Sequence, residues 1–311
     1  MRLGVLDVGS NTVHLLVVDA HRGGHPTPAL SQKSALKLAA HLDPAGALTE
    51  QGYDSLLTTV GESAQAAARH GCKELLAFAT SAVRDATNSG EVLDSIRNLT
   101  GVDLQVLTGP EEARLTFLAA RRWYGWSAGN LLMLDIGGGS LEIAAGHDEE
   151  PEVALSLPLG AGRLHRQWTP SDPPTADQVE KLKKLLAGKL SSAGKKIKAA
   201  GPFDQVVATS KTFRTLARLT GAAPSSAGPR ALRTLTAPGL RQVAAFLQRM
   251  ASVDIACLEG VSATRAGQIA TGALIAEATV TALGLEQLTI CPWALREGII
   301  LRRLDQLAFA P

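Results

Sequence analysis

Two glycine turns that each follow an aspartate are the part of this chain whose residue types and spacing could do chemistry. The first, LDVGSNT, runs from Leu6 to Thr12, and the second, LDIGGGS, runs from Leu134 to Ser140. Backbone N–H groups in such turns bind phosphate oxygens, and carboxylates such as those of Asp7 and Asp135 are ligands that Mg²⁺ accepts. The pair of turns therefore indicates a site for a phosphate chain that carries a magnesium ion.

The residues around each turn predict the elements that position it. A short apolar run precedes each aspartate, and apolar residues alternate with others after each turn, at 13–18 and 141–145. This pattern predicts a strand, a turn and a second strand in both halves. The second copy follows the first by about one domain length, so we expect two similar domains that face one another. An ordinary hairpin turn explains one copy alone, whereas two copies at this interval favour a ligand site.

The wider pattern predicts an α/β chain of two domains, residues 1–125 and 126–311, with the segment 125–129 as linker. The last helix is a candidate to pack back on the first domain. Strands are expected near 2–8, 13–20, 28–38, 75–79, 104–107, 131–136, 141–146, 152–158 and 206–208. Helices are expected near 50–70, 91–99, 111–123, 177–199, 211–219, 239–250, 262–283 and 294–307.

Two common nucleotide-binding motifs do not fit these turns. A dinucleotide fold places its glycines between a strand and a helix, but the residues after Gly139 alternate with a period of two. A P-loop needs a glycine directly before its lysine, but Ser210 precedes Lys211. The glycine turns therefore belong to neither class.

Composition places the chain among ordinary globular proteins. Its 311 residues are 45% hydrophobic and 19% charged, and the net charge of +2 predicts no nucleic-acid partner. Asp7 interrupts the first apolar run, so we expect no signal peptide. The apolar stretch 269–285 contains Glu277, so we expect a core helix and no membrane span. The cysteines are interpreted as reduced core thiols of a cytoplasmic protein, without structural zinc: Cys72, Cys257 and Cys291.

Seven lysines and no acidic residue occupy the stretch 181–198. Its leucines keep roughly helical spacing, which predicts a solvated surface helix. The alternative is a surface that attracts a polyanion through its long-range field. The sequence leaves both interpretations open.

Two segments between the glycine turns, 80–85 and 108–115, carry further candidate groups. The segment 108–115 begins a helix after Thr108, where Glu111 and Glu112 could serve only as acidic residues of the first helical turn. A carboxylate near two phosphate-binding turns could instead orient and deprotonate a water for in-line attack on phosphorus. Arg84 could clamp the phosphate oxygens, with a plain salt bridge as its alternative role.

With these motifs read in order, the chain resembles the exopolyphosphatase and guanosine pentaphosphate phosphohydrolase family. The resemblance rests on LDVGSNT, TSAVRDA, GPEEARL, LDIGGGSLE and WALREG, and it covers the whole chain. It implies the duplicated, ribonuclease H-like fold of actin, sugar kinases and Hsp70, with a cleft between two domains. It also implies removal of the terminal phosphate from inorganic polyphosphate with Mg²⁺ or Mn²⁺.

The resemblance also implies roles for individual residues. Glu112, not Glu111, matches the family's catalytic base, and Arg84 matches its phosphate-contacting arginine. Asp135 and Glu142 match its metal-associated acids, and Asp7 is the matching acid of the first turn. The remaining implied contacts to phosphate come from Ser10, Asn11, Gly137, Gly138, Gly139 and Ser140.

Two departures from the family's pattern affect the expected substrate. The segment 208–212 reads ATSKT where a Gly-x-x-Gly-Thr turn is usual, which puts the approach of a bulky nucleoside in doubt. Ser210 and Lys211 there are candidate phosphate contacts, and a surface pair at a helix start is the alternative. The chain ends soon after the Arg296 to Gly298 motif, whereas longer relatives have further helical domains, so we expect short polyphosphate chains.

Several functions stay open beside exopolyphosphatase. They are a guanosine pentaphosphate phosphohydrolase, a non-catalytic sensor of polyphosphate or nucleotide, and an actin-like ATPase or sugar kinase, because a fold alone does not define a function. The partners expected are inorganic polyphosphate and, as the alternative, guanosine pentaphosphate, with no nucleic acid and no membrane. A homodimer is left open.

Overall fold

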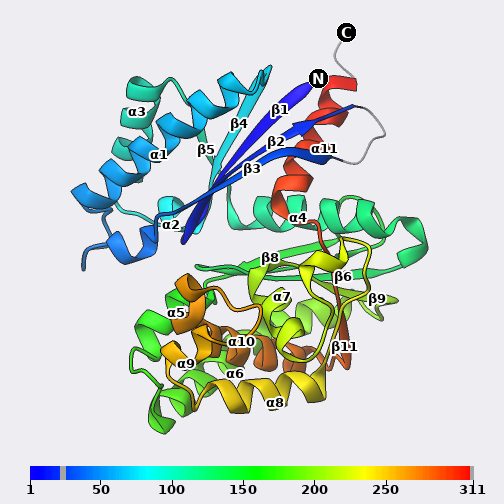
Figure 1. Ribbon diagram of the computed structural model, residues 1–311. Coiled ribbons are helices and arrows are strands. Elements are labelled where there is room, and N and C mark those ends of the chain that lie inside the picture. Colours follow the sequence, from blue (N-terminus) through cyan, green and yellow to red (C-terminus); the bar gives the residue numbers. More distant parts are fainter. Residues whose placement is uncertain (22–25, 309–311) are drawn as a thin grey trace. The chain divides into compact units, whose positions relative to one another are not determined.

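A computed structural model describes residues 1–21 and 26–308 (Figure 1). Its contacts divide the chain into two compact units. Unit 1 comprises Met1–Leu115 together with the segment that begins at Leu295, and unit 2 comprises Thr116–Ala294. The division lies slightly before the boundary drawn from the sequence, and the last helix groups with unit 1.

Unit 1 contains a mixed five-stranded sheet in the order β3-β2-β1-β4-β5. Its strands are β1 (Arg2–Val8), β2 (Thr12–Asp19), β3 (Thr27–Ala35), β4 (Glu74–Ala79) and β5 (Leu104–Val106). Strands β1, β2 and β3 are antiparallel neighbours, and β4 and β5 continue the sheet in parallel with β1. Its other elements are η1 (Leu38–His41), α1 (Glu50–Arg69), α2 (Ser81–Arg84), α3 (Ser89–Thr100), the start of α4 (Gly109–Tyr124) and α11 (Leu295–Ala308).

Both faces of this sheet are covered, as the nearly continuous buried run of β1 requires, because successive side chains of a strand point to opposite faces. Leu6 and Val8 belong to a buried cluster with residues of α1 and α3. Leu3 and Val5 belong to another cluster, which includes Ile299 and Ile300 of α11. The strand that carries the first glycine turn is therefore held between two helical layers.

Unit 2 contains a mixed six-stranded sheet in the order β10-β11-β9-β6-β7-β8. Its strands are β6 (Leu131–Ile136), β7 (Leu141–Gly146), β8 (Val153–Leu157), β9 (Gln205–Ala208), β10 (Thr234–Thr236) and β11 (Gln287–Ile290). Its α-helices, besides the rest of α4, are α5 (Ala161–Trp168), α6 (Ala176–Ala199), α7 (Ser210–Leu219), α8 (Ala237–Leu247), α9 (Ser252–Ala256) and α10 (Ala266–Leu283). Short 3₁₀ turns occur at η2 (Trp126–Ala128), η3 (Ser225–Ala227) and η4 (Ala263–Arg265).

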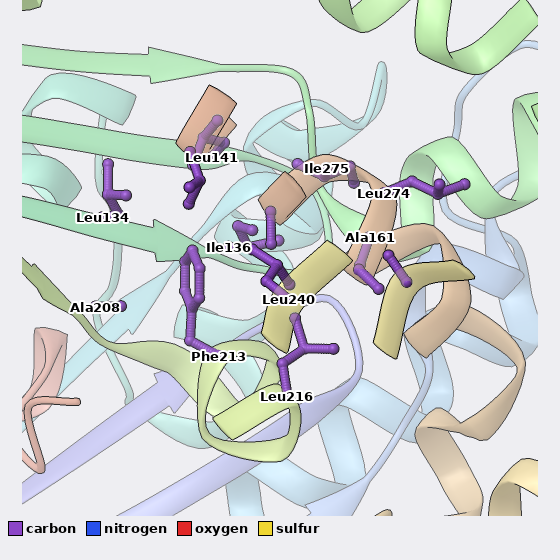
Figure 2. Close-up of a cluster of buried hydrophobic side chains, with 14 of the residues drawn as sticks. Leu134, Ile136, Leu141, Ala161, Ala208, Phe213, Leu216, Leu240, Leu274 and Ile275 are labelled. Carbon is purple, nitrogen blue, oxygen red and sulfur yellow. The ribbon is translucent and has the colours of Figure 1, made fainter. Parts of the chain in front are cut away.

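One large apolar core holds unit 2 together (Figure 2). Leu134 and Ile136 of β6 lie in the same buried cluster as Phe213 of α7, Leu240 of α8 and Leu274 of α10. The strand that carries the second glycine turn is thus fixed by the packing of several helices. The predicted class is confirmed: both units are α/β, and the fold is the duplicated actin-like one.

The elements that the sequence patterns missed are short. Strands β10 and β11 have three and four residues, and helices α5 and α9 have eight and five. Such lengths give too few repeats for an apolar period to be recognised. These short elements are stabilised by packing against their neighbours in the sheet and the core.

Helix α10 lies in the core, as expected for the apolar stretch. The segment Ala263–Leu283 is long and apolar enough to span a membrane, but 67% of its apolar window is buried within the protein. The three cysteines are free thiols, and the core-thiol prediction is wrong for one of them. Cys291 is buried and Cys72 is partly buried, but Cys257 is exposed.

Candidate active site

The two glycine turns have the same hydrogen-bonding pattern. The backbone N–H of Gly9 donates to the carbonyl oxygen of Thr12 at 3.0 Å, and that of Gly137 donates to the carbonyl oxygen of Ser140 at 2.9 Å. Both turns join antiparallel strands, as predicted. The repeat seen in the sequence is therefore a repeat of backbone structure.

A second repeat lies beside each turn, at the end of the neighbouring parallel strand. Strand β4 ends in Ala79 and continues into Thr80-Ser81, and strand β9 ends in Ala208 and continues into Thr209-Ser210. The two threonines precede helices with almost the same backbone angles, φ −111° and ψ −155° at Thr80 and φ −109° and ψ −153° at Thr209. The repeated Ala-Thr-Ser triplet is the sequence signal that could have revealed this second pair.

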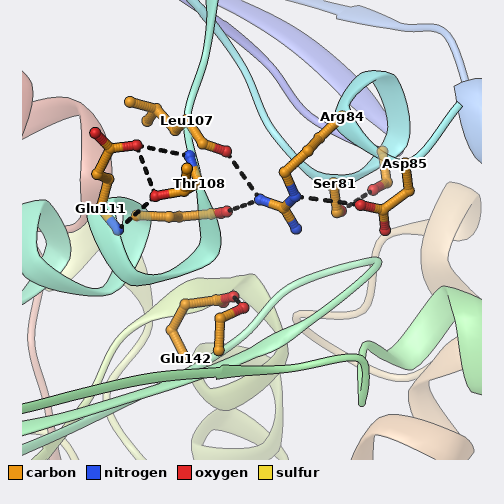
Figure 3. Close-up of polar contacts among 10 residues, drawn as sticks. Ser81, Arg84, Asp85, Leu107, Thr108, Glu111 and Glu142 are labelled. Atoms are coloured by element: carbon orange, nitrogen blue, oxygen red, sulfur yellow. Dashed lines mark hydrogen bonds and ion pairs between the residues drawn. The ribbon is translucent and has the colours of Figure 1, made fainter. Parts of the chain in front are cut away.

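In unit 1 the Arg84 side chain lies among polar groups, with Asp85 on one side of its guanidinium and the Leu107 backbone on the other (Figure 3). The Nη1 group of Arg84 donates to Oε2 of Glu112 at 3.4 Å and to the carbonyl oxygen of Leu107 at 3.1 Å. Its Nε donates to the carboxylate of Asp85 at 3.2 Å. The Ser10 and Ser81 hydroxyls are 3.0 Å apart. The first turn and the helix that carries Arg84 are thus linked through their hydroxyls.

The neighbouring acids Glu111 and Glu112 have different surroundings. The Glu111 carboxylate accepts hydrogen bonds from the backbone N–H and the hydroxyl of Thr108, at 2.8 and 2.6 Å, and the Glu111 N–H donates back to that hydroxyl. This reciprocal arrangement is a capping box. The hydrogen bonds from Thr108 lower the pKa of Glu111 below its ordinary value, which makes its carboxylate a weaker base. Glu111 therefore caps the helix.

In unit 2 two carboxylates lie opposite one another. Asp135 of β6 and Glu142 of β7 are directly paired in the antiparallel register, so their side chains leave the same face of the sheet. The Thr209 hydroxyl donates to the Asp135 carboxylate, and the Ser156 hydroxyl donates to that of Glu142 at 2.8 Å. Glu142 is only 2% exposed. The donor hydroxyls hold both groups in place as acceptors.

This carboxylate pair fits a magnesium ion. Mg²⁺ takes oxygen ligands, keeps several waters and usually binds one or two protein carboxylates. Within the ranges 1–21 and 26–308, no group of three or more His, Cys, Asp or Glu side chains gathers as a metal cage. The metal role of Asp135 and Glu142 stays a prediction, and the chemistry of the pair suits it.

Helix α5, which the sequence pattern missed, supports the second glycine turn. The N–H groups of Ala161 and Arg163 donate to the carbonyl oxygens of Gly137 and Gly138, at 3.0 and 2.9 Å. Gly160 packs directly on the Gly139–Ser140 backbone, where a Cβ atom would lie under 3.0 Å from backbone atoms. The turn therefore rests on the start of α5.

The structure also locates the other predicted phosphate contacts. Lys211 lines a small cavity together with Gly137 and Gly138, so its place suits a phosphate contact. Ser210 has a positive φ of 67°, which is rare for a residue with a side chain. The carbonyl oxygen of Asn11 accepts from Leu36 and Lys37, at 3.1 and 3.0 Å. These three contacts to phosphate remain predictions.

The lysine-rich stretch forms part of α6, and its apolar residues Leu182, Leu186, Leu190 and Ile197 are buried in the core. Lys181 pairs with Asp177 one turn earlier, at 2.7 Å. The end of α6 lies beside the start of β6, since the Asn130 side chain donates to the carbonyl oxygen of Ala200 at 2.7 Å. The second glycine turn follows the other end of β6, so the last lysines lie away from it.

We therefore expect that reversing Lys195, Lys196 and Lys198 to Glu leaves catalysis nearly unchanged. Exposed charges act over about 8 Å at physiological salt, whereas a six-residue strand spans about 20 Å. The measurement is kcat/KM for long polyphosphate at low and high salt. A large, salt-sensitive fall in kcat/KM would instead support electrostatic steering by this helix.

The strand–turn–strand unit occurs once in each half of the chain, and the fold is the duplicated one of actin, sugar kinases and Hsp70. Similarity to known proteins identifies the family. The chain belongs to the Ppx/GppA phosphatase family, whose model matches residues 17–307. The recognition made from the motifs is thereby confirmed. Phosphatases of this family generally depend on a divalent metal.

Individual relatives agree with this assignment. Exopolyphosphatase 1 of Mycobacterium tuberculosis is 64% identical over 308 residues, which are 99% of this chain and 90% of the relative. The crystal structure of an exopolyphosphatase from Cytophaga hutchinsonii has a TM-score of 0.88 at 26% identity and 98% coverage of both chains. A guanosine-5'-triphosphate,3'-diphosphate pyrophosphatase of Aeromonas hydrophila is more distant, at 28% identity over 95% of this chain and 58% of the relative.

Proposed function

We propose that this protein is an exopolyphosphatase that hydrolyses the terminal phosphate of inorganic polyphosphate. The observation that carries the proposal is the pairing of Arg84 with Glu112 while the adjacent Glu111 is used to cap the helix. Family membership and the 64% identical relative named an exopolyphosphatase support it.

In the proposed reaction, Glu112 accepts a proton from a water molecule as the water oxygen attacks the terminal phosphorus. The bond from that phosphorus to the bridging oxygen breaks, and the shortened polyphosphate leaves with the bridging oxygen. Arg84 stabilises the negative charge on the non-bridging oxygens. The backbone N–H groups of Gly138 and Gly139 and the side chain of Lys211 orient the phosphate chain.

A divalent cation, Mg²⁺ or Mn²⁺, would be held by Asp135 and Glu142. When bound, it would offset the negative charge of the phosphate oxygens. The Ser156 and Thr209 hydroxyls would keep the two carboxylates oriented toward that task. We also propose a cytoplasmic location.

Hydrolysis of guanosine pentaphosphate is the second candidate function. It is favoured by the more distant similarity to the Aeromonas hydrophila pyrophosphatase. It is disfavoured by the segment 208–212, where side chains stand in place of the family's glycines. The substrate would need room for a purine and a ribose beside this segment.

Phosphate release from three substrates tests these functions directly. Polyphosphate, guanosine pentaphosphate and ATP are compared at equal Mg²⁺, and we expect the highest kcat/KM with polyphosphate. A Glu112→Gln preparation serves as the control for contaminating phosphatases. A higher kcat/KM with guanosine pentaphosphate would favour the second candidate, and binding of polyphosphate without any release would indicate a sensor.

A further inference from the structure

The repeated turns carry an acid at the same position, but the neighbours of the two acids differ. Asp7 and Asp135 each lie two residues before the glycine whose N–H closes the turn. The residue opposite Asp7 on the next strand is His14, whereas the residue opposite Asp135 is Glu142. The second turn thus has a carboxylate pair where the first has an acid and an imidazole.

A guanidinium lies at the first turn. Nη1 of Arg296 donates to Oδ2 of Asp7 at 2.9 Å, and both side chains are largely buried, with 23% and 17% of their surface exposed. Burial first, and then the nearby charges of Arg296 and Lys33, lower the pKa of His14 to about 3. His14 is therefore neutral at physiological pH, and its Nε2 lies 2.8 Å from the Ser31 hydroxyl.

The fold holds Arg296 rigidly at this place. It is the second residue of α11, whose Ile299 and Ile300 share a buried cluster with Leu3 and Val5 of β1. Gly298 lets α11 approach the Leu115 carbonyl so closely that a Cβ atom would lie under 3.0 Å from it. The Nε atom of Arg296 is buried and has no hydrogen-bond partner within the described residues.

A guanidinium and a metal ion can do the same electrostatic work at a phosphate turn. Both neutralise an adjacent carboxylate and attract phosphate oxygens, and arginine does so without dissociating. A carboxylate that already accepts from a buried guanidinium is a poorer ligand for a second cation, because the two cations would repel one another at short range.

We propose that Arg296 is the fixed cation of the first turn and binds a phosphate oxygen of the substrate there. Asp7 is then a positioning residue for Arg296 and not a metal ligand, and the metal belongs to Asp135 and Glu142 alone. This inference rests on the proposed function in taking a phosphate chain as the ligand. It revises the metal role that the motif resemblance implied for Asp7.

The test compares the two equivalent acids in the intact protein. Binding of Mn²⁺ is measured by electron paramagnetic resonance and calorimetry, without substrate, for the wild type, Asp7→Asn and Asp135→Asn. We expect Asp135→Asn to weaken Mn²⁺ binding by about tenfold or more, because a metal ligand is lost. Even the loss of a residue that only supports a ligand typically weakens metal binding by about tenfold or more. We expect Asp7→Asn to leave Mn²⁺ affinity unchanged.

Kinetics then test the phosphate-binding role of Arg296. Arg296→Gln is expected to raise KM for polyphosphate about tenfold or more, because the substrate loses a hydrogen bond to a charged donor. The Mg²⁺ concentration for half-maximal rate is expected to stay the same. The double variant Asp7→Asn, Arg296→Gln should have a KM for polyphosphate only slightly higher than that of Arg296→Gln alone, since the two residues act as one unit.

Either of two results would overturn the inference. One is equal loss of Mn²⁺ affinity in Asp7→Asn and Asp135→Asn, which would make Asp7 a metal ligand. The other is an unchanged KM in Arg296→Gln. Circular dichroism checks that each variant is folded, and Arg296→Met, which removes the charge but keeps a long side chain, replaces Arg296→Gln if that variant unfolds. Because Mn²⁺ binding needs no substrate, a failure of the proposed function leaves this comparison decisive.

Discussion

Replacing Glu112 with Gln is expected to lower kcat for polyphosphate by about 10²- to 10⁴-fold, the usual contribution of a positioned general base. Glutamine keeps the size and shape of the side chain but cannot accept a proton from water. It can still accept a hydrogen bond from Arg84, so the local structure is expected to remain. The measurement is phosphate release under saturating polyphosphate and Mg²⁺.

Glu111→Gln is the matched control because it makes the same chemical change one residue earlier. Glutamine also serves in a capping box, so the hydrogen bonds from Thr108 can persist. We expect kcat close to that of the wild type and a small change in thermal stability. Similar kcat losses in the two variants would contradict the assignment of Glu112 as the base.

The glycine turns and the strands around them could be predicted from the sequence because their signals are local. An apolar run, an aspartate, a glycine and an alternating run define each hairpin within about fifteen residues, and the structure has both. The long helices α1, α6 and α10 were predicted for the same reason, since each repeats its apolar period several times. Local pattern of sufficient length is what made these predictions succeed.

The parts of the candidate site that could not be predicted depend on long-range contacts. Asp7 and Arg296 are 289 residues apart in the chain, and no local pattern connects them. The choice between Glu111 and Glu112 rests on the family resemblance and stays a prediction, and the hydrogen bonds from Thr108 show only that Glu111 caps the helix. Helix α5 carries few apolar residues, so its contact with the second turn could be seen only in the fold.

The contact of α5 with the second turn leads to the other large expected effect, that of Gly160→Ala. The backbone of Gly160 has φ −79° and ψ 148°, which any residue can adopt, so conformational strain is not the reason for glycine here. The reason is space. An added Cβ would lie under 3.0 Å from backbone atoms of Gly139 and Ser140, which cannot rotate away as a flexible side chain could.

We expect Gly160→Ala to destabilise the protein by about 1–3 kcal/mol, the usual cost of overpacking. We also expect it to lower kcat/KM on the order of 10²-fold, because a shift of about 1 Å in a substrate-positioning group has an effect of this size. Gly188→Ala in α6 is the matched control, since Gly188 is exposed and its added Cβ would have no neighbour within 4 Å apart from its own helix backbone. That variant is expected to gain about 0.5–1 kcal/mol from helix propensity. Thermal unfolding and phosphate release measure both effects, and wild-type values for Gly160→Ala would show that the turn does not need this close contact.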